Sequence, residues 1–216
     1  RVLDAEEFRS AFIGDLSHEL RSPLSSLTGF IETLQGPARD DDNARAHFLQ
    51  LMENEAHRMK NLIDDLLSLS QLEAEEHIRP SEKVDLVTLA ASVILVGKQK
   101  ALKRNMEIRL NTENVVPSVL GDSDELRRVI RNLVDNAISY GKESSIIEVS
   151  INPIDLVYPA HVPGVALSVH NKGAGIEQTD IPRLTERFYR TDKARSRETG
   201  GTGLGLAIVK HAINRH

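Results

Sequence analysis

The spacing of apolar residues changes midway along the chain, and this change limits the folds that the chain can adopt. Between Phe8 and Leu34, apolar residues recur every three or four positions, which is the period of one apolar stripe on an α-helix. The stripe resumes between Phe48 and about Leu72, after "QGPARDDDN", which carries a glycine, a proline and an acidic run. We therefore predict two helices in an antiparallel hairpin, with the acidic run in the loop and as a helix cap.

The second half mixes helical and alternating patterns. A helix is predicted at 86–102, and another begins at a cap near Asp122 or Ser123 and runs through "ELRRVIRNLVDNAISY". Strands are predicted in "MEIRL", "SIIEVSI" and "GVALSVH", followed by a short helix near "DIPRLTERF" and a last helix after Gly205. Helices mixed with several hairpin-like strands indicate a two-layer α+β domain.

These patterns divide the chain into a helical hairpin at 1–76, a linker at 77–84 and an α+β domain at 85–216. A lone hairpin has few neighbours against which to bury both of its stripes. We therefore predict a homodimer in which two hairpins form a four-helix bundle. The linker is rich in charge, contains Pro80, and is expected to act as a hinge.

The amino-acid composition and net charge of the chain exclude several classes of protein. With 40% apolar and 27% charged residues the chain reads as globular, and its net charge of -5 gives no reason to expect a nucleic acid partner. Because it contains no cysteine, it has no disulfide, no thiolate zinc site and no thiol nucleophile. No apolar run approaches the roughly 20 residues that span a bilayer. We expect a cytoplasmic portion of a longer protein, with any membrane anchor outside it.

One histidine of the first helix lies on the side opposite its apolar stripe. At about 100° per residue, His18 falls about 200° from Leu16 and is therefore expected to be exposed. Glu19 is its neighbour and Ser22 lies one turn on. An exposed imidazole beside a carboxylate can act as a nucleophile whose proton is taken up, although the same pair also suits an ordinary surface. Pro23 follows, and it marks either a helix end or a tolerated defect.

Polar motifs of the second half suggest a phosphate site. Asn132 and Asn136 are four residues apart on one helix face, and amide oxygens are suitable ligands for magnesium. Gly173 and Gly175 follow a predicted strand, and "GGTGLGL" leads into the last helix. Glycines allow the backbone to approach a ligand closely, and a helix N-terminus favours phosphate. Taken singly, each motif is also typical of a turn or a helix surface.

In this order, the motifs resemble the catalytic core of bacterial sensor histidine kinases. "FIGDLSHELRSPLSSLTGF" is similar to the phosphoacceptor box, "NLVDNAISYG" to the N-box and "NKGAGI" to the first glycine box. "TERFYR" is similar to the aromatic box and "GGTGLGL" to the second glycine box. "GFIETLQGPARDD" and "PRLTERFYRTDKARS" further resemble phosphate-regulon sensor kinases.

The resemblance implies a phosphotransfer hairpin followed by a Bergerat-type ATP-binding domain, a two-layer α/β sandwich. It makes His18 the phosphoacceptor and Glu19 its base or orienting acid, and places Ser22 with them as a catalytic residue. Asn136 would bind Mg²⁺, Asn132 would lie beside the phosphates, and Tyr140 would flank the adenine. The whole implied ATP site is Asn132, Asn136, Tyr140, Asn171, Gly173, Gly175, Ile176, Phe188, Arg195, Arg197, Gly201, Thr202, Gly203, Leu204, Gly205 and Leu206.

A basic segment precedes the second glycine box and corresponds to the mobile lid of the family. It carries Arg187, Arg190, Lys193, Arg195 and Arg197. We expect Arg195 or Arg197 to reach the γ-phosphate. The alternative is a solvated basic loop.

Three positions depart from the family pattern. Asn171 stands where an aspartate usually accepts a hydrogen bond from the adenine amine, so ATP binding is expected to weaken. Ser139 replaces a lysine that commonly precedes the N-box tyrosine, which removes one phosphate contact. Ser22 stands where kinases that also dephosphorylate their partner often carry Thr or Asn, but its hydroxyl can still orient a water.

The predicted function is therefore an ATP- and Mg²⁺-dependent protein-histidine kinase. It would phosphorylate itself on His18 and pass the phosphoryl group to an aspartate in the receiver domain of a response regulator, and the resemblance to phosphate-regulon sensor kinases implies a role in phosphate-starvation signalling. One alternative is a dimeric signalling scaffold that binds ATP poorly because of Asn171 and Ser139. Another, an ATP hydrolase of the same fold, needs a glutamate base where this chain has Asn132.

Overall fold

The computed structural model describes residues 2–113, 115–157, 162–191 and 201–216. The chain divides into two compact units. One comprises residues 1–68 and 187–204, and the other comprises residues 69–186 and 205–216.

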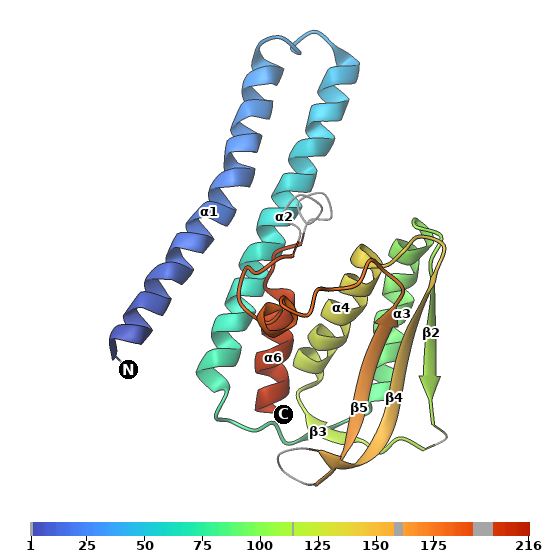
Figure 1. Cartoon of the computed structure of the whole chain (residues 1–216). Coiled ribbons are helices and arrows are strands. Elements are labelled where there is room, and N and C mark those ends of the chain that lie inside the picture. Colours follow the sequence, from blue (N-terminus) through green and yellow to red (C-terminus); the bar gives the residue numbers. More distant parts are fainter. Residues whose placement is uncertain (1, 114, 158–161, 192–200) are drawn as a thin grey trace. The chain divides into compact units, whose positions relative to one another are not determined.

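Two long helices dominate the first unit. Helix α1 spans Val2–Gln35 and helix α2 spans Asp42–Glu75, and the two run antiparallel (Figure 1). Asp41 caps α2, because its carboxylate accepts hydrogen bonds from the backbone N–H groups of Asn43 and Ala44 at 2.9 and 3.0 Å. The predicted hairpin and cap are therefore confirmed. Both helices extend beyond their apolar stripes because the flanking residues are strong helix formers such as Ala, Glu and Gln.

A mixed three-stranded sheet forms one layer of the second unit. Its strands β2 (Glu107–Thr112), β4 (Ile146–Val157) and β5 (Val162–Asn171) lie in the order β2-β4-β5. Strands β4 and β5 are antiparallel neighbours, whereas β2 pairs with β4 in parallel. A parallel pair needs a crossover connection, and the chain between β2 and β4 contains helix α4.

Helices form the other layer. Helix α3 spans Leu86–Leu102, α4 spans Ser123–Tyr140 and α6 spans Gly205–Arg215. Asp85 and Asp122 cap α3 and α4, each by accepting two backbone N–H groups of the first turn. The predicted helix starts and the two-layer α+β architecture are confirmed.

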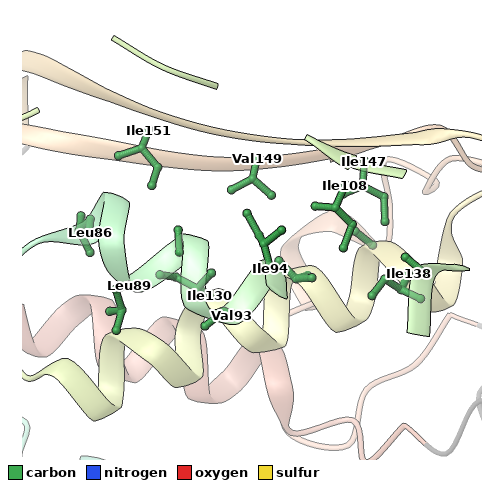
Figure 2. Close-up of a cluster of buried hydrophobic side chains, with 14 of the residues drawn as sticks. Leu86, Leu89, Val93, Ile94, Ile108, Ile130, Ile138, Ile147, Val149 and Ile151 are labelled. Carbon is green, nitrogen blue, oxygen red and sulfur yellow. The ribbon is translucent and has the colours of Figure 1, made fainter. Parts of the chain in front are cut away.

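The core of this unit lies between the sheet and helices α3 and α4. On β4, Ile147, Val149 and Ile151 are fully buried, as expected for alternate residues on one face of a strand. Their side chains point toward Val93 and Ile94 of α3 (Figure 2). Each such fully buried side chain contributes about 1.5 to 3 kcal/mol to folding.

Two details differ from the predictions. Strands β1 (Glu82–Val84) and β3 (Val119–Gly121) pair in an antiparallel two-stranded sheet that the sequence did not predict. Three-residue strands are too short to show an alternating pattern. The helix predicted near "DIPRLTERF" is a single 3₁₀ turn at Ile181–Arg183, because Pro182 allows a helix start but the apolar residues around it do not continue a stripe.

An arginine fixes the end of α2 within the second unit. Arg215 is only 7% exposed, and its Nε donates to the carbonyl oxygens of Glu75 and Ile78 at 3.2 and 2.9 Å. Its Nη2 lies 3.1 Å from the Glu75 carboxylate, and its Nη1 contacts the Glu125 carboxylate. Burial raises the pKa of Glu125, and the nearby Arg215 opposes this effect. Any hinge motion at the predicted linker must either spare or break these contacts.

Candidate active site

His18 lies on α1 and is exposed, as its position opposite the apolar stripe predicted. Glu19 beside it is half-buried, and Ser22 is exposed one turn on. Helix α1 continues through Pro23 to its end, so this proline is a tolerated defect inside the helix. Its ring is fully buried. Because proline has no N–H, the carbonyl of Glu19 lacks its usual partner in the helix.

The two asparagines of the N-box lie on α4, whose opposite side packs into the core through residues such as Ile130 and Val134. Asn132 and Asn136 are both half-buried. The side-chain amide of Asn132 donates a 3.2 Å hydrogen bond to the carbonyl oxygen of Gly205, the first residue of α6. The face predicted to hold phosphate thus meets the N-terminal end of α6, where unpaired backbone N–H groups favour anions.

The end of α4 also meets the end of β5. Gly141 and Gly173 form an isolated β-bridge between these segments. A side chain at Gly173 would place its Cβ 3.0 Å from the carbonyl oxygen of Tyr140, so any other residue would crowd this backbone oxygen. Tyr140 is 38% exposed at this junction and Asn171 is half-buried. The residues predicted to border the adenine therefore lie together.

An arginine that the sequence did not single out supports this junction. Arg104 donates to the carbonyl oxygens of Ser139 and Gly141 at 2.9 and 3.1 Å, and also to that of Ile138. These are carbonyls at the C-terminal end of α4, which lack partners within the helix. A cation suits this end of a helix because of the helix dipole. No motif marks Arg104, since its partners are backbone atoms about 35 residues away.

One glycine of the first glycine box has a left-handed backbone conformation and open space around it. Gly175 has a φ of +84°, which favours glycine, and a Cβ built on it would meet no atom within 4 Å. Ile176 follows and is 54% exposed.

Residues 201–204 of the second glycine box belong to the compact unit that contains the hairpin, whereas Gly205 and Leu206 belong to the second unit. Gly203 has a φ of +74°, and its carbonyl accepts a 2.9 Å hydrogen bond from the N–H of Phe188. The Thr202 hydroxyl donates to the Asp65 carboxylate of α2 at 2.7 Å. Arg190 donates to the carbonyl oxygen of Gly201. The box and the aromatic box that precedes it are thus bonded to each other and to α2.

Nine residues of the predicted ATP site lie in the second unit, namely Asn132, Asn136, Tyr140, Asn171, Gly173, Gly175, Ile176, Gly205 and Leu206. The first unit contains His18, Glu19, Ser22, Phe188, Gly201, Thr202, Gly203 and Leu204. The approach of the two groups stays a prediction. Arg195 and Arg197 lie outside the described residues.

Asn132 and Asn136 of the second unit offer amide oxygens, which are suitable ligands for magnesium. Within the described ranges, no group of three or more His, Cys, Asp or Glu side chains could hold a metal ion. Asn132 donates its NH₂ group to Gly205, and its amide oxygen is an acceptor that a cation could use. A hard cation that keeps several waters needs one or two protein oxygens beside those of the phosphates, and Asn136 fits this need.

Comparisons with known families cover both halves of the chain. The His Kinase A (phospho-acceptor) domain matches residues 8–75, and the histidine kinase-, DNA gyrase B- and HSP90-like ATPase domain matches residues 121–216. The phosphate regulon sensor protein PhoR of Pseudomonas aeruginosa is 39% identical over the whole chain. The chain belongs to the sensor histidine kinase family.

Other members of this family are also similar. The sensor-like histidine kinase SenX3 of Mycolicibacterium smegmatis is 36% identical over 98% of the chain, and the sensor histidine kinase WalK of Bacillus subtilis is 32% identical over 98%. The chain covers 47% of PhoR, 53% of SenX3 and 34% of WalK. It therefore spans about half or less of the curated relatives that it matches.

Solved histidine kinases share the fold. ThkA, solved in complex with the response regulator protein TrrA, has a TM-score of 0.68 at 21% identity, covering 87% of this chain and 53% of that one. AdeS of Acinetobacter baumannii has a TM-score of 0.64 at 24% identity, covering 92% and 86%. Full-length ShkA in complex with AMPPNP has a TM-score of 0.61 at 26% identity, covering 94% and 40%. None of the helices in the described ranges has the length and apolar character of a membrane span.

Proposed function

We propose that this chain is the kinase core of a sensor protein and transfers the γ-phosphoryl group of ATP to its own His18. The observation that carries the proposal is the combination of two features in one family member. An exposed histidine stands beside a carboxylate in a phosphoacceptor domain, and an ATPase domain follows it in which Asn132 is hydrogen-bonded to Gly205, the first residue of α6.

In the proposed reaction, a nitrogen of the neutral imidazole of His18 attacks the γ-phosphorus in line with the bond to the β-phosphate oxygen. The N–P bond forms, the P–O bond breaks, and ADP leaves. Glu19 accepts or orients the proton that the imidazole loses. Most of the rate enhancement comes from positioning and from electrostatic stabilisation of the phosphates. Mg²⁺ bound through Asn136 would offset phosphate charge.

The second proposed step passes the phosphoryl group to an aspartate of a response regulator. The N–P bond breaks and an acyl phosphate forms on the regulator. The pairing of ThkA with TrrA supports a partner of this kind, and the similarity to PhoR supports a role in phosphate signalling. The exposed hydroxyl of Ser22, one turn from His18, supports a second activity in which it orients a water to remove that phosphoryl group.

We further propose that the hairpin forms a homodimer. Large apolar side chains of both helices are exposed in the single chain, although an apolar stripe is normally buried. They are Ile13, Leu24, Ile31, Leu49, Ile63 and Leu67. A four-helix bundle would cover them. We also propose that this core lies in the cytoplasm, within a longer sensor protein that is anchored in a membrane, as its similarity to sensor kinases suggests.

The test of the kinase uses γ-labelled ATP and magnesium. We expect the wild-type chain to acquire label that is lost in acid and kept in alkali, as a phosphoramidate requires. His18→Gln should carry none, whereas His57→Gln, at an exposed histidine of α2, should be labelled like the wild type. Label that persists on His18→Gln would refute the assignment. Absence of label on the wild type would favour the alternative, a signalling scaffold with weak ATP binding through Asn171 and Ser139.

A further inference from the structure

The carboxylate of Glu19 is held from the opposite helix of the hairpin. Nη2 of Arg58, on α2, lies 3.5 Å from Oε2 of Glu19. The Arg58 side chain is 15% exposed and that of Glu19 is 31% exposed. Arg58 also lies 3.9 Å from Oε2 of Glu55 on its own helix. A half-buried cation thus joins a carboxylate of α1 to a carboxylate of α2 beside the phosphoacceptor histidine.

A second arginine reaches the same oxygen. Nη2 of Arg190, from the segment that precedes the second glycine box, lies 3.3 Å from Oε2 of Glu19, and its side chain is 6% exposed. Both guanidinium groups therefore approach Oε2 of Glu19. Two charged donors on Oε2 restrict the orientation of the Glu19 carboxylate. Its other oxygen, Oε1, remains as an acceptor.

Orientation rather than stability explains this pair best. An ion pair of this partial exposure at 3.5 Å contributes little to folding, because the loss of water offsets the attraction. A group that takes up a proton during phosphoryl transfer depends strongly on its geometry, since a displacement of about 1 Å can cost on the order of 100-fold in rate. An unheld glutamate on a helix surface samples several rotamers.

We propose that Arg58 is a positioning residue for the phosphorylation of His18, because it holds Oε2 of Glu19 so that Oε1 can receive the imidazole proton. This inference rests on the proposed kinase function. Arg58 itself touches neither ATP nor His18 in the proposed reaction and acts through Glu19.

The test is a double-mutant cycle on the autophosphorylation rate at saturating ATP. Arg58→Gln should lower kcat by on the order of 10-fold, with KM for ATP unchanged, and Arg58→Lys should restore part of the rate because it keeps the charge. In the Glu19→Gln background, Arg58→Gln should cause no further loss, because the group through which it acts is already gone. Arg45→Gln, at an exposed arginine of α2 paired with Asp42, is the control and should not change the rate.

The outcomes separate the inference from the function. If Arg58→Gln lowers the rate by the same factor with and without Glu19, Arg58 has a merely structural role and the inference is wrong. An unchanged rate in Arg58→Gln, on a chain whose His18 is labelled, also overturns it and leaves the kinase intact. A wild-type chain without label on His18 instead contradicts the proposed function itself.

Discussion

The side-chain amide of Asn132 is hydrogen-bonded at 3.2 Å to the carbonyl oxygen of Gly205. This bond joins the middle of α4 to the start of α6, two segments 73 residues apart. In this bond the NH₂ group of the Asn132 side chain is the donor. A carboxylate at the same position could not donate, which distinguishes this site from ATPases of the same fold that use a glutamate base there.

Asn132→Asp should weaken ATP binding. The change removes the donor to Gly205 and adds a negative charge on the face predicted to hold phosphates. We expect a loss of affinity of roughly 10-fold, since a lost hydrogen bond to a buried acceptor costs about 1 to 3 kcal/mol. Titration with a fluorescent ATP analogue measures it. Asn214→Asp, at an exposed asparagine of α6, is the control, and equal affinities of the two variants would contradict the placement of phosphate at Asn132.

Asn171→Asp should strengthen ATP binding. A carboxylate accepts a hydrogen bond from the adenine amine more strongly than an amide does, by about 0.5 to 1.5 kcal/mol, or roughly 2- to 10-fold in affinity. Calorimetric titration with ATP compares this variant with the wild type and with Asn111→Asp, an exposed change on β2. Unchanged affinity in Asn171→Asp would show that residue 171 does not meet the adenine.

Arg104→Ala should destabilise the second unit and weaken ATP binding together. It leaves carbonyl oxygens at the end of α4 without their charged donor, at a cost of about 2 to 3 kcal/mol. Tyr140 stands at that end, so its position should also change. Urea unfolding measures the first effect and ATP titration the second. Arg109→Ala, which removes an exposed arginine paired with Glu107, should change neither, and identical behaviour of the two variants would count against this role of Arg104.

The cap of α3 should make folding stability depend on acid pH. The Thr88 hydroxyl, 2.6 Å from the Asp85 carboxylate, and then the Thr88 backbone N–H lower the pKa of Asp85. A lowered folded-state pKa gives stability that is complete above the ordinary value of 3.8 and is lost as pH falls through the folded value. At neutral pH, Asp85→Ala should cost about 1 kcal/mol.

Asp85→Asn separates charge from hydrogen bonding, because the amide oxygen can still accept. The stability advantage of the wild type over Asp85→Asn should therefore shrink as the pH is lowered from 7 to 3, as followed by urea unfolding. An advantage that is constant over this range would show that the charge of Asp85 plays no part.

The features that the sequence predicted correctly are those with local causes. The starts of α3 and α4 follow from the side-chain caps Asp85 and Asp122, and the exposure of His18 follows from helical periodicity. The contacts of Arg58, Arg104 and Arg215 could not be predicted from the sequence, because each arginine joins segments that are distant in sequence or donates to backbone carbonyls. The strands β1 and β3 were missed because pairing, rather than pattern, stabilises them.

The central claim is that His18 accepts the phosphoryl group of ATP, and peptide mapping tests it most directly. After incubation with ATP and magnesium, tryptic digestion at alkaline pH releases the segment from Ser10 to Arg21, which also contains Ser17. Mass spectrometry with fragmentation should place one phosphoryl group on His18. A phosphoryl group on Ser17 or on another segment, or an unmodified segment in a chain that binds ATP, would contradict the account.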